Sequence, residues 1–375
     1  MFGANRILLL GATGHTGRLV GEELLKNEIP FEFSGRDEKR LEILAREWKR
    51  PYFSLDLSKP SDFEKIGPDV TIIINCAGPF NLYALQFLEF LDGRKVTYLD
   101  ISGEQSFVIS AFNRLRGKNT KATFVHACAF ESFVAEALAG LLQIEGKELL
   151  DISSFYYFKE HRVSPGTRLS MQIVRHFQTY VYDHKKLLPQ APADVIIDAD
   201  ATMADVLEAK AVFTPFPEVL FFSHRFNTQS ASSYYVVGNE ELFLFRRKPG
   251  EVRPLSEIVE KHKTREALKS NTDQSLAGHF KVSVRAKFKS GNDSIASLEG
   301  KNSYDVTATI VVEYLKELLQ GAGPNSGVLH NTEPKRGFLP NAESKAGFYS
   351  PCELLDGRKV LDRVIAKHNL KLEIH

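Results

Sequence analysis

The sequence predicts an α/β fold in which a Rossmann-type, doubly wound parallel sheet is followed by a second, α+β domain containing an antiparallel sheet. Three observations support this prediction. Short apolar runs alternate with helical periodicity over the first 145 residues, a glycine-rich turn follows the first run, and long alternating segments begin after about residue 150. A chain of 375 residues also exceeds what one hydrophobic core usually organises, so we expect more than one domain.

The first region, residues 1–145, reads as a dinucleotide-binding domain built from successive strand and helix units. Between the second and third expected strands, Leu41, Leu44, Ala45 and Trp48 follow the i, i+3, i+4, i+7 spacing of a helix that packs one apolar stripe against a sheet. The expected strands are Ile7–Leu10, Phe31–Ser34, Tyr52–Ser54, Val70–Asn75, Val96–Asp100 and Thr123–His126.

Aromatic, alternating segments mark the second region, residues 146–320, which we expect to bind substrate or to mediate dimerisation. Its expected strands are Ile152–Phe158, Val219–Phe222, Tyr234–Phe245 and Phe280–Phe288. Its expected helices are Leu169–Tyr182, Ala201–Ala209 and Val306–Leu319. Residues 321–346 are rich in Gly, Pro, Asn and Lys and predict an exposed loop, which a final helix, Leu355–His368, follows.

Composition and charge exclude several classes of function. The chain has 48 basic and 47 acidic residues, a formal net charge of +1, so no basic field attracts nucleic acid. Cys76, Cys128 and Cys352 fit neither a disulfide framework nor a CxxC metal site, and the histidines are scattered, so we expect a reducing, cytoplasmic location and no metal. The start lacks the pattern of a secretory signal, and no run approaches the ~20 apolar residues of a transmembrane segment.

A glycine-rich turn directly follows the first expected strand and opens an amphipathic helix. Gly11 suits a tight turn, Gly14 a close approach of a pyrophosphate, and Gly17 close packing of helix on strand, while the helix N-terminus offers amides to the phosphates. A turn that needs glycine only for its own conformation is the alternative. The expected cofactor contacts here are Gly11, Thr13, Gly14, His15, Thr16 and Gly17.

The preferred cofactor is NADP(H) rather than NAD(H). The GxxGxxG spacing is the variant seen more often with NADP(H), and no acidic residue ends the second strand to bind a ribose hydroxyl. Arg36 and Ser34 stand there instead and are expected to bind the 2′-phosphate, although Arg36 could simply pair with Asp37 or Glu38. Asp56, after the third strand, is expected to accept a hydrogen bond from the adenine amino group, with a cap or turn role as the alternative.

Two further motifs point to a family. The segments Asn75–Phe80 (NCAGPF), with Tyr83 after it, and Tyr98–Glu104 (YLDISGE) join the GATGHTG turn and the Gly-Arg pair after the second strand. Together they resemble the saccharopine dehydrogenase-like oxidoreductases, a group that includes trans-acting enoyl reductases. The resemblance is strong over about the first 135 residues and weak beyond, with Ala129 and Glu131 standing where the family usually has glycine and aspartate.

The resemblance implies a Rossmann domain, an inserted α+β domain, and a C-terminal segment, residues 321–375, that returns to the Rossmann half. It does not identify the substrate, because members of the family range from amino-acid dehydrogenases to lipid-related reductases and proteins without assigned activity.

Candidate chemical groups follow the fourth and fifth strands, since ligands of open parallel sheets lie beyond the carboxyl ends of the strands. Small residues at Ala77, Gly78 and Pro79 let the backbone pass beside the ribose and nicotinamide. Tyr83 is a candidate proton donor, or an aromatic side chain that packs on the next helix.

Two acidic residues in the second of these loops are also candidates. Asp100 and Glu104 are candidate catalytic carboxylates, whose alternative roles are to cap a helix beginning near Gln105 and to bind backbone amides. Cys128 and His126 alternate in an apolar stretch, which favours a buried cysteine over a nucleophile.

The sequence therefore predicts an NADP(H)-dependent oxidoreductase. It would transfer a hydride to or from a carbonyl, imine or enoyl carbon of a small-molecule or lipid-like substrate lying between the two domains. The alternative is a non-catalytic, cofactor-binding scaffold or redox-responsive protein of the same fold. A homodimer through the second domain is a further hypothesis.

Overall fold

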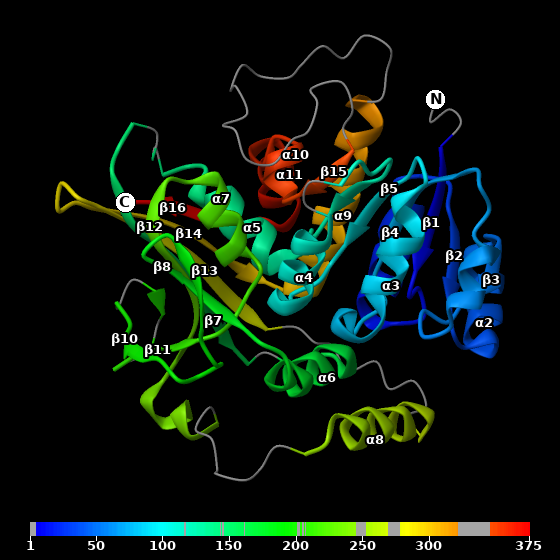
Figure 1. Ribbon diagram of the computed structural model, residues 1–375, viewed down its shortest axis with the longest axis horizontal. Coiled ribbons are helices and arrows are strands. Elements are labelled where there is room, and N and C mark those ends of the chain that lie inside the picture. Colours follow the sequence, from blue (N-terminus) through cyan, green and yellow to red (C-terminus); the bar gives the residue numbers. More distant parts are fainter. Residues whose placement is uncertain are drawn as a thin grey trace. The chain divides into compact units, whose positions relative to one another are not determined.

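The structure, a computed structural model, describes residues 5–115, 118–142, 144, 146–160, 162–200, 203, 204, 206, 208–244, 253–268, 278–321 and 346–375 (Figure 1). The chain forms two compact units. Unit 1 comprises Met1–Gly103, Phe107–Phe133 and Tyr304–Val364, and unit 2 comprises Glu104–Ser106, Val134–Ser303 and Ile365–His375. In chain order, the main segment of unit 2, Val134–Ser303, thus lies between segments of unit 1, and Ile365–His375 follows the last of them.

Unit 1 is built on a seven-stranded parallel sheet with the order β15-β6-β5-β4-β1-β2-β3. Its strands are β1 (Arg6–Leu10), β2 (Glu32–Gly35), β3 (Tyr52–Ser54), β4 (Val70–Asn75), β5 (Thr97–Asp100), β6 (Thr123–Val125) and β15 (Gly347–Tyr349). The predicted Rossmann-type sheet and its first six strands are confirmed. The sequence does not predict β15, because three residues are too few to show a period.

Helices alternate with these strands and cover both faces of the sheet. They are α1 (His15–Lys26), α2 (Glu38–Trp48), a 3₁₀ turn η1 (Pro60–Lys65), α3 (Phe80–Asp92), α4 (Gln105–Leu115), α5 (Phe130–Ala139), α9 (Ser303–Gly321), α10 (Pro351–Leu354) and α11 (Gly357–His368). On one face, Ile7 and Phe33 of the sheet share a core with Val20 of α1, Leu41 of α2 and Val311 of α9. This two-sided cover explains the nearly continuous apolar runs of the strands.

The other face of the sheet packs against α3 and α4 through aromatic side chains. The ring of Phe87 in α3 lies 6.2 Å from that of Tyr98 in β5, and Phe80 lies 5.6 Å from Phe107 of α4. The packing of α9 on the first face differs from the expectation that residues 306–319 close the second region. An apolar stripe specifies that a helix packs on a sheet but not on which sheet.

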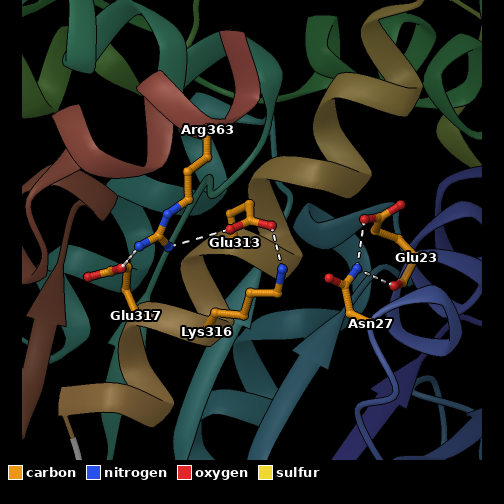
Figure 2. A network of polar contacts seen from close by, with 6 residues as sticks. All are labelled: Glu23, Asn27, Glu313, Lys316, Glu317 and Arg363. Atoms are coloured by element: carbon orange, nitrogen blue, oxygen red, sulfur yellow. Dashed lines mark hydrogen bonds and ion pairs between the residues drawn. The ribbon is translucent and has the colours of Figure 1, made fainter. Parts of the chain in front are cut away.

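Ion pairs join α9 to α11 in unit 1. Figure 2 shows Arg363 of α11 between two carboxylates of α9, 3.4 Å from Glu313 and 2.5 Å from Glu317, while Lys316 lies 2.6 Å from Glu313. Glu313 is largely buried, with 10% of its side chain exposed, so it depends on these cations. In the same view Asn27 donates to the carbonyl and carboxylate of Glu23 and closes the last turn of α1.

Arg363→Ala is expected to lower the free energy of unfolding by about 0.5–1 kcal/mol, because Arg363 is partly solvated and Lys316 still neutralises Glu313. Urea unfolding measures the change. The matched control is Arg358→Ala on the same helix, which removes an exposed i, i+4 pair with Asp362 and should cost less than about 0.5 kcal/mol. Equal losses in the two variants would show that the α9–α11 network adds nothing.

Unit 2 contains a nine-stranded mixed sheet. Its main path is β10-β11-β12-β7-β13-β14-β16, with β8 and β9 attached to β12; β12 and β7 run parallel and the other pairs antiparallel. The strands are β7 (Leu149–Lys159), β8 (Tyr180–Asp183), β9 (Lys186–Pro189), β10 (Ile196–Asp198), β11 (Lys210–Phe213), β12 (Thr228–Val237), β13 (His279–Phe288), β14 (Asp293–Lys301) and β16 (Lys371–Ile374). The predicted α+β domain with a largely antiparallel sheet is confirmed.

The helical segments of unit 2 are α6 (Pro165–Ile173), η2 (Val174–His176), α7 (Glu218–Arg225), η4 (Asn239–Leu244) and α8 (Leu255–Leu268). The prediction of a strand at Val219–Phe222 is wrong, because these residues form the buried part of α7. A short apolar run does not distinguish a buried strand from a buried helix.

Other predicted bounds in unit 2 also change. The helix predicted at Leu169–Tyr182 ends at Ile173 and gives way to β8, and the strand predicted at Tyr234–Phe245 ends at Val237. Several predictions fall wholly or partly outside the described residues: Phe245, part of Ala201–Ala209, and most of the loop at 321–346.

Two further findings concern the described ranges only. No helix there has the length and apolar character needed to span a membrane. Among the same residues, no group of three or more His, Cys, Asp or Glu side chains is placed to hold a metal ion.

Candidate cofactor-binding site

The glycine-rich turn lies between the carboxyl ends of β1, β2 and β4. The amides of Gly11 and Ala12 donate to the carbonyl of Ser34 at the end of β2, at 2.9 and 3.1 Å. Gly11 has a φ of +77°, and a Cβ there would lie 2.7 Å from the amide nitrogen of Ala77 after β4. The backbone itself therefore requires glycine at position 11.

The other two glycines differ in what requires them. A Cβ on Gly17 would lie 2.1 Å from the carbonyl oxygen of Gly11, so packing of α1 on the turn demands glycine. Gly14 has an ordinary φ of −78° and is exposed, and a Cβ there would meet only that same oxygen, at 3.2 Å. Gly14 is thus less crowded than Gly11 and Gly17, although a Cβ there would press on the Gly11 carbonyl, and its exposed position suits a ligand that approaches the backbone.

Gly14 is also the N-cap of α1, and it has no side chain to occupy the first amides of the helix. Thr13 precedes it, while His15 and Thr16 form the first turn of α1 and are half-buried. The ring of His15 packs edge to face with Tyr304 of α9, with the ring centroids 4.9 Å apart. Tyr304 could not be predicted as a neighbour of the turn, because almost the whole second region separates the two in the sequence.

The end of β2 carries the groups expected at the 2′-phosphate. Ser34 is fully buried, and among the described residues its hydroxyl has no hydrogen-bond partner. Arg36 is exposed directly after the strand, and the Asp37 carboxylate caps α2 by accepting the amide of Arg40 at 3.2 Å. The guanidinium of Arg40 donates to the carbonyl of Thr13 at 2.7 Å, which the sequence analysis did not foresee.

Asp56 forms a turn after β3. Its Oδ1 accepts hydrogen bonds from the amide and the hydroxyl of Ser58, at 3.0 and 2.7 Å, and its own amide donates to Asp62. The turn role that the sequence allowed is therefore present. Oδ2 takes part in no hydrogen bond within the described ranges.

The loop after β4 comes close to the glycine-rich turn. The amide of Cys76 donates to the carbonyl of Leu10 at 2.9 Å, and the amide of Ala77 donates to the side chain of Asn75 at 2.9 Å. Gly78 and Pro79 lead into α3, and Tyr83 is half-buried in the first turn of that helix rather than in the loop.

Asp100 ends β5 and is completely buried. Its Oδ1 accepts the amides of Ser102 and Ala127, at 3.1 and 2.9 Å, and its Oδ2 lies 2.6 Å from Nδ1 of His126. The structure thus shows Asp100 in its alternative role of binding backbone amides. Burial is the main cause that raises the pKa of the Cys76 thiol, and the negative charge of Asp100 raises it further. The thiol of Cys76 therefore stays protonated near neutral pH.

The other carboxylate of this segment belongs to unit 2. Glu104 precedes α4, is buried, and accepts a hydrogen bond from the hydroxyl of Ser170 in α6 at 2.7 Å. Cys128, in unit 1, is fully buried, and its amide donates to the carbonyl of Asp100 at 2.7 Å.

A parallel sheet of this order, with a glycine-rich turn between its first strand and first helix, defines a Rossmann-type protein. Over 99% of both chains, the fold is similar to that of the L-Glu-forming saccharopine dehydrogenase of Saccharomyces cerevisiae, with a TM-score of 0.58 and 10% identity. At this identity the similarity concerns the fold alone.

Curated proteins match about a third of the chain. They are a "probable mitochondrial saccharopine dehydrogenase-like oxidoreductase" of Arabidopsis thaliana (31% identity, 35% of this chain, 33% of the relative), a trans-acting enoyl reductase of Mycobacterium ulcerans (28%, 35%, 33%) and a saccharopine dehydrogenase-like oxidoreductase of Bos taurus (27%, 27%, 28%). The matched part thus spans about a third of each relative's length or less. No family model matches. These findings confirm the resemblance to the saccharopine dehydrogenase-like oxidoreductases that the motifs indicate.

Proposed function

We propose that this protein is an NADP(H)-dependent oxidoreductase. The observation that carries the proposal is Gly14, which is exposed at the N-terminus of α1 in a backbone conformation that does not itself require glycine. The absence of a side chain there serves a group that approaches from outside, and the helix amides favour an anion. The oxidoreductase names of the relatives agree with this reading.

The residues around the turn fit a dinucleotide. Thr13, Gly14, His15 and Thr16 would hold the pyrophosphate, between the two structural glycines Gly11 and Gly17. At the ribose, Arg36 would pair with the 2′-phosphate, and Ser34, whose buried hydroxyl has no hydrogen-bond partner among the described residues, is the second group that we propose there. The unused Oδ2 of Asp56 would accept the adenine amino group. When bound, NADP(H) supplies the hydride.

The nicotinamide half would lie along Ala77, Gly78 and Pro79 at the end of β4. Tyr83, half-buried in the first turn of α3, is the proton donor that we propose for this side. Asp100 is unsuited to proton transfer, because amides and His126 already occupy its oxygens. Glu104 remains a candidate that could bind the substrate.

The proposed substrate has a carbonyl, imine or enoyl carbon and is a small molecule or lipid-like. NADPH deuterated at the transferred position is incubated with the purified protein and a cell extract, and metabolites are analysed by mass spectrometry. The enzyme should place deuterium in at least one metabolite, and a Gly14→Val variant should not. Binding of NADPH without any transfer would favour a scaffold, for which the commitment of Asp100 to backbone amides is the supporting observation.

Two subsidiary proposals concern the cellular location and the oligomeric state of the protein. Cys76, Cys128 and Cys352 are not joined by disulfides, which favours a reducing compartment such as the cytosol. A mitochondrial location, stated in the name of the Arabidopsis relative, is the alternative, and fractionation of cells expressing a tagged chain distinguishes the two. A homodimer through unit 2 is tested by light scattering.

A further inference from the structure

A series of buried polar side chains runs across three neighbouring strands of unit 1, and the proposed function assigns no role to most of it. Asn75 ends β4, Tyr98 and Asp100 lie in β5, and His126 follows β6; each is 0% exposed. The Asn75 amide donates to the Tyr98 hydroxyl at 2.9 Å, the ring of Tyr98 packs against that of His126 with the centroids 5.8 Å apart, and Asp100 lies 2.6 Å from Nδ1 of His126. These four side chains thus form one buried network of two polar pairs that are joined by the contact of the Tyr98 and His126 rings.

This network holds the loops that follow each of the three strands. Asn75 Oδ1 accepts the amide of Ala77 in the first loop, and Asp100 Oδ1 accepts the amides of Ser102 and Ala127 in the second and third. Ala127 has a φ of +57°, a left-handed conformation that is unfavourable for alanine and persists only where the surroundings fix it. One backbone amide in each loop therefore depends on the network.

His126 is built to orient Asp100 rather than to transfer a proton. Nδ1 of His126 faces the carboxylate of Asp100, which accepts hydrogen bonds, so Nδ1 carries the hydrogen of the bond between them. Its Nε2 is buried with no hydrogen-bond partner among the described residues, and the ring stacks on Phe348 at 4.8 Å and meets the edge of Phe107 at 5.5 Å. In the part of the chain that the structure describes, the imidazole thus has its polar contact with Asp100 alone, and it holds that carboxylate in place.

The three loops lie at the carboxyl edge of the sheet, beside the turn proposed to bind pyrophosphate, where an open parallel sheet receives its ligand. We propose that the network of Asn75, Tyr98, Asp100 and His126 positions these loops around the nicotinamide half of the cofactor, with His126 as a positioning residue. This inference rests on the proposed function. It also makes a prediction of its own: a change in the network should affect binding of the nicotinamide half and not of the adenosine half. The reason is that the adenosine half would bind at β1 to β3, away from the network.

The test compares two ligands on three proteins. NADPH probes both halves of the site, whereas 2′,5′-ADP has the adenosine and 2′-phosphate but no nicotinamide. His126→Leu removes the donor to Asp100, and His126→Asn keeps an N–H near the position of Nδ1. By calorimetry, we expect His126→Leu to weaken NADPH by roughly tenfold or more and to leave 2′,5′-ADP unchanged, while His126→Asn stays within about threefold of wild type for both.

Each other outcome decides a different point. If wild type binds neither ligand, the proposed function fails. If wild type binds both, and His126→Leu either weakens both equally or weakens neither, the positioning role is refuted and the proposed function stands. Should His126→Leu fail to fold, Tyr98→Phe replaces it, since that change removes a single oxygen from the network. Loss of NADPH affinity with 2′,5′-ADP unchanged is again expected.

Discussion

Replacing Gly14 by valine should abolish measurable binding of NADP(H) and leave the protein folded. The backbone at Gly14 has a φ of −78°, which valine adopts readily, and the added Cβ meets only the carbonyl of Gly11, at 3.2 Å. The branched side chain would instead fill the space through which a pyrophosphate must approach the amides of α1. Calorimetry measures the binding, and circular dichroism and thermal melting verify the fold.

Gly17 supplies the matched control for this prediction. A Cβ on Gly17 would lie 2.1 Å from the carbonyl oxygen of Gly11, so Gly17→Ala should lower the melting temperature whether or not cofactor is present. The two substitutions are thus expected to act in different ways. Gly14→Val should exclude the ligand, whereas Gly17→Ala should disrupt the packing of α1 on the turn. A folded Gly14→Val protein with unchanged NADP(H) affinity would mean that the cofactor site lies elsewhere.

Removal of Arg36 should change the choice between cofactors. If its guanidinium pairs with the 2′-phosphate, Arg36→Ala deletes a charge-assisted contact that NAD(H) never makes. A hydrogen bond to a charged group contributes ~1.5 to 3 kcal/mol, so NADP(H) should bind roughly tenfold to hundredfold more weakly, with little change for NAD(H). Titration of both cofactors against wild type and variant measures the difference.

Arg46→Ala is the control for general electrostatics. Arg46 is exposed in the last turn of α2, so its removal subtracts the same charge without touching the end of β2. It should leave both affinities almost unchanged at physiological salt, where charges more than about 8 Å apart are screened. Parallel losses for NAD(H) and NADP(H) in Arg36→Ala would instead favour an exposed pair of Arg36 with Asp37 or Glu38.

Local patterns were enough to predict the Rossmann half of the protein. The first strand, the glycine-rich turn and α1 are contiguous, and each has a signal within a few residues: an apolar run, glycines at fixed offsets, and a helical stripe. The stripe of Leu41, Leu44 and Trp48 faces the core as expected. The same reasoning failed at Val219–Phe222, where four consecutive apolar residues have no period that separates a strand from a helix.

Contacts between distant residues required the tertiary structure. The pairing of Asp100 with His126 spans 26 positions, and the contact of His15 with Tyr304 joins the turn to a helix that the sequence analysis assigned to the second region. Neither pair has a local signature, because a side chain's partner depends on strand order and on which sheet a helix packs against.

By itself, the sequence determined the fold class, the parallel sheet with its first six strands, and a glycine-rich turn between the first strand and the first helix, because these follow from local periodicity and backbone sterics. The tertiary structure decided how crowded each glycine of the turn is, since only neighbouring atoms show that a Cβ at Gly11 or Gly17 would clash with the backbone and that a Cβ at Gly14 would be less crowded. It also decided that Asp100 is a buried anchor for loops rather than a free carboxylate. Burial and hydrogen-bond partners arise only when distant strands meet.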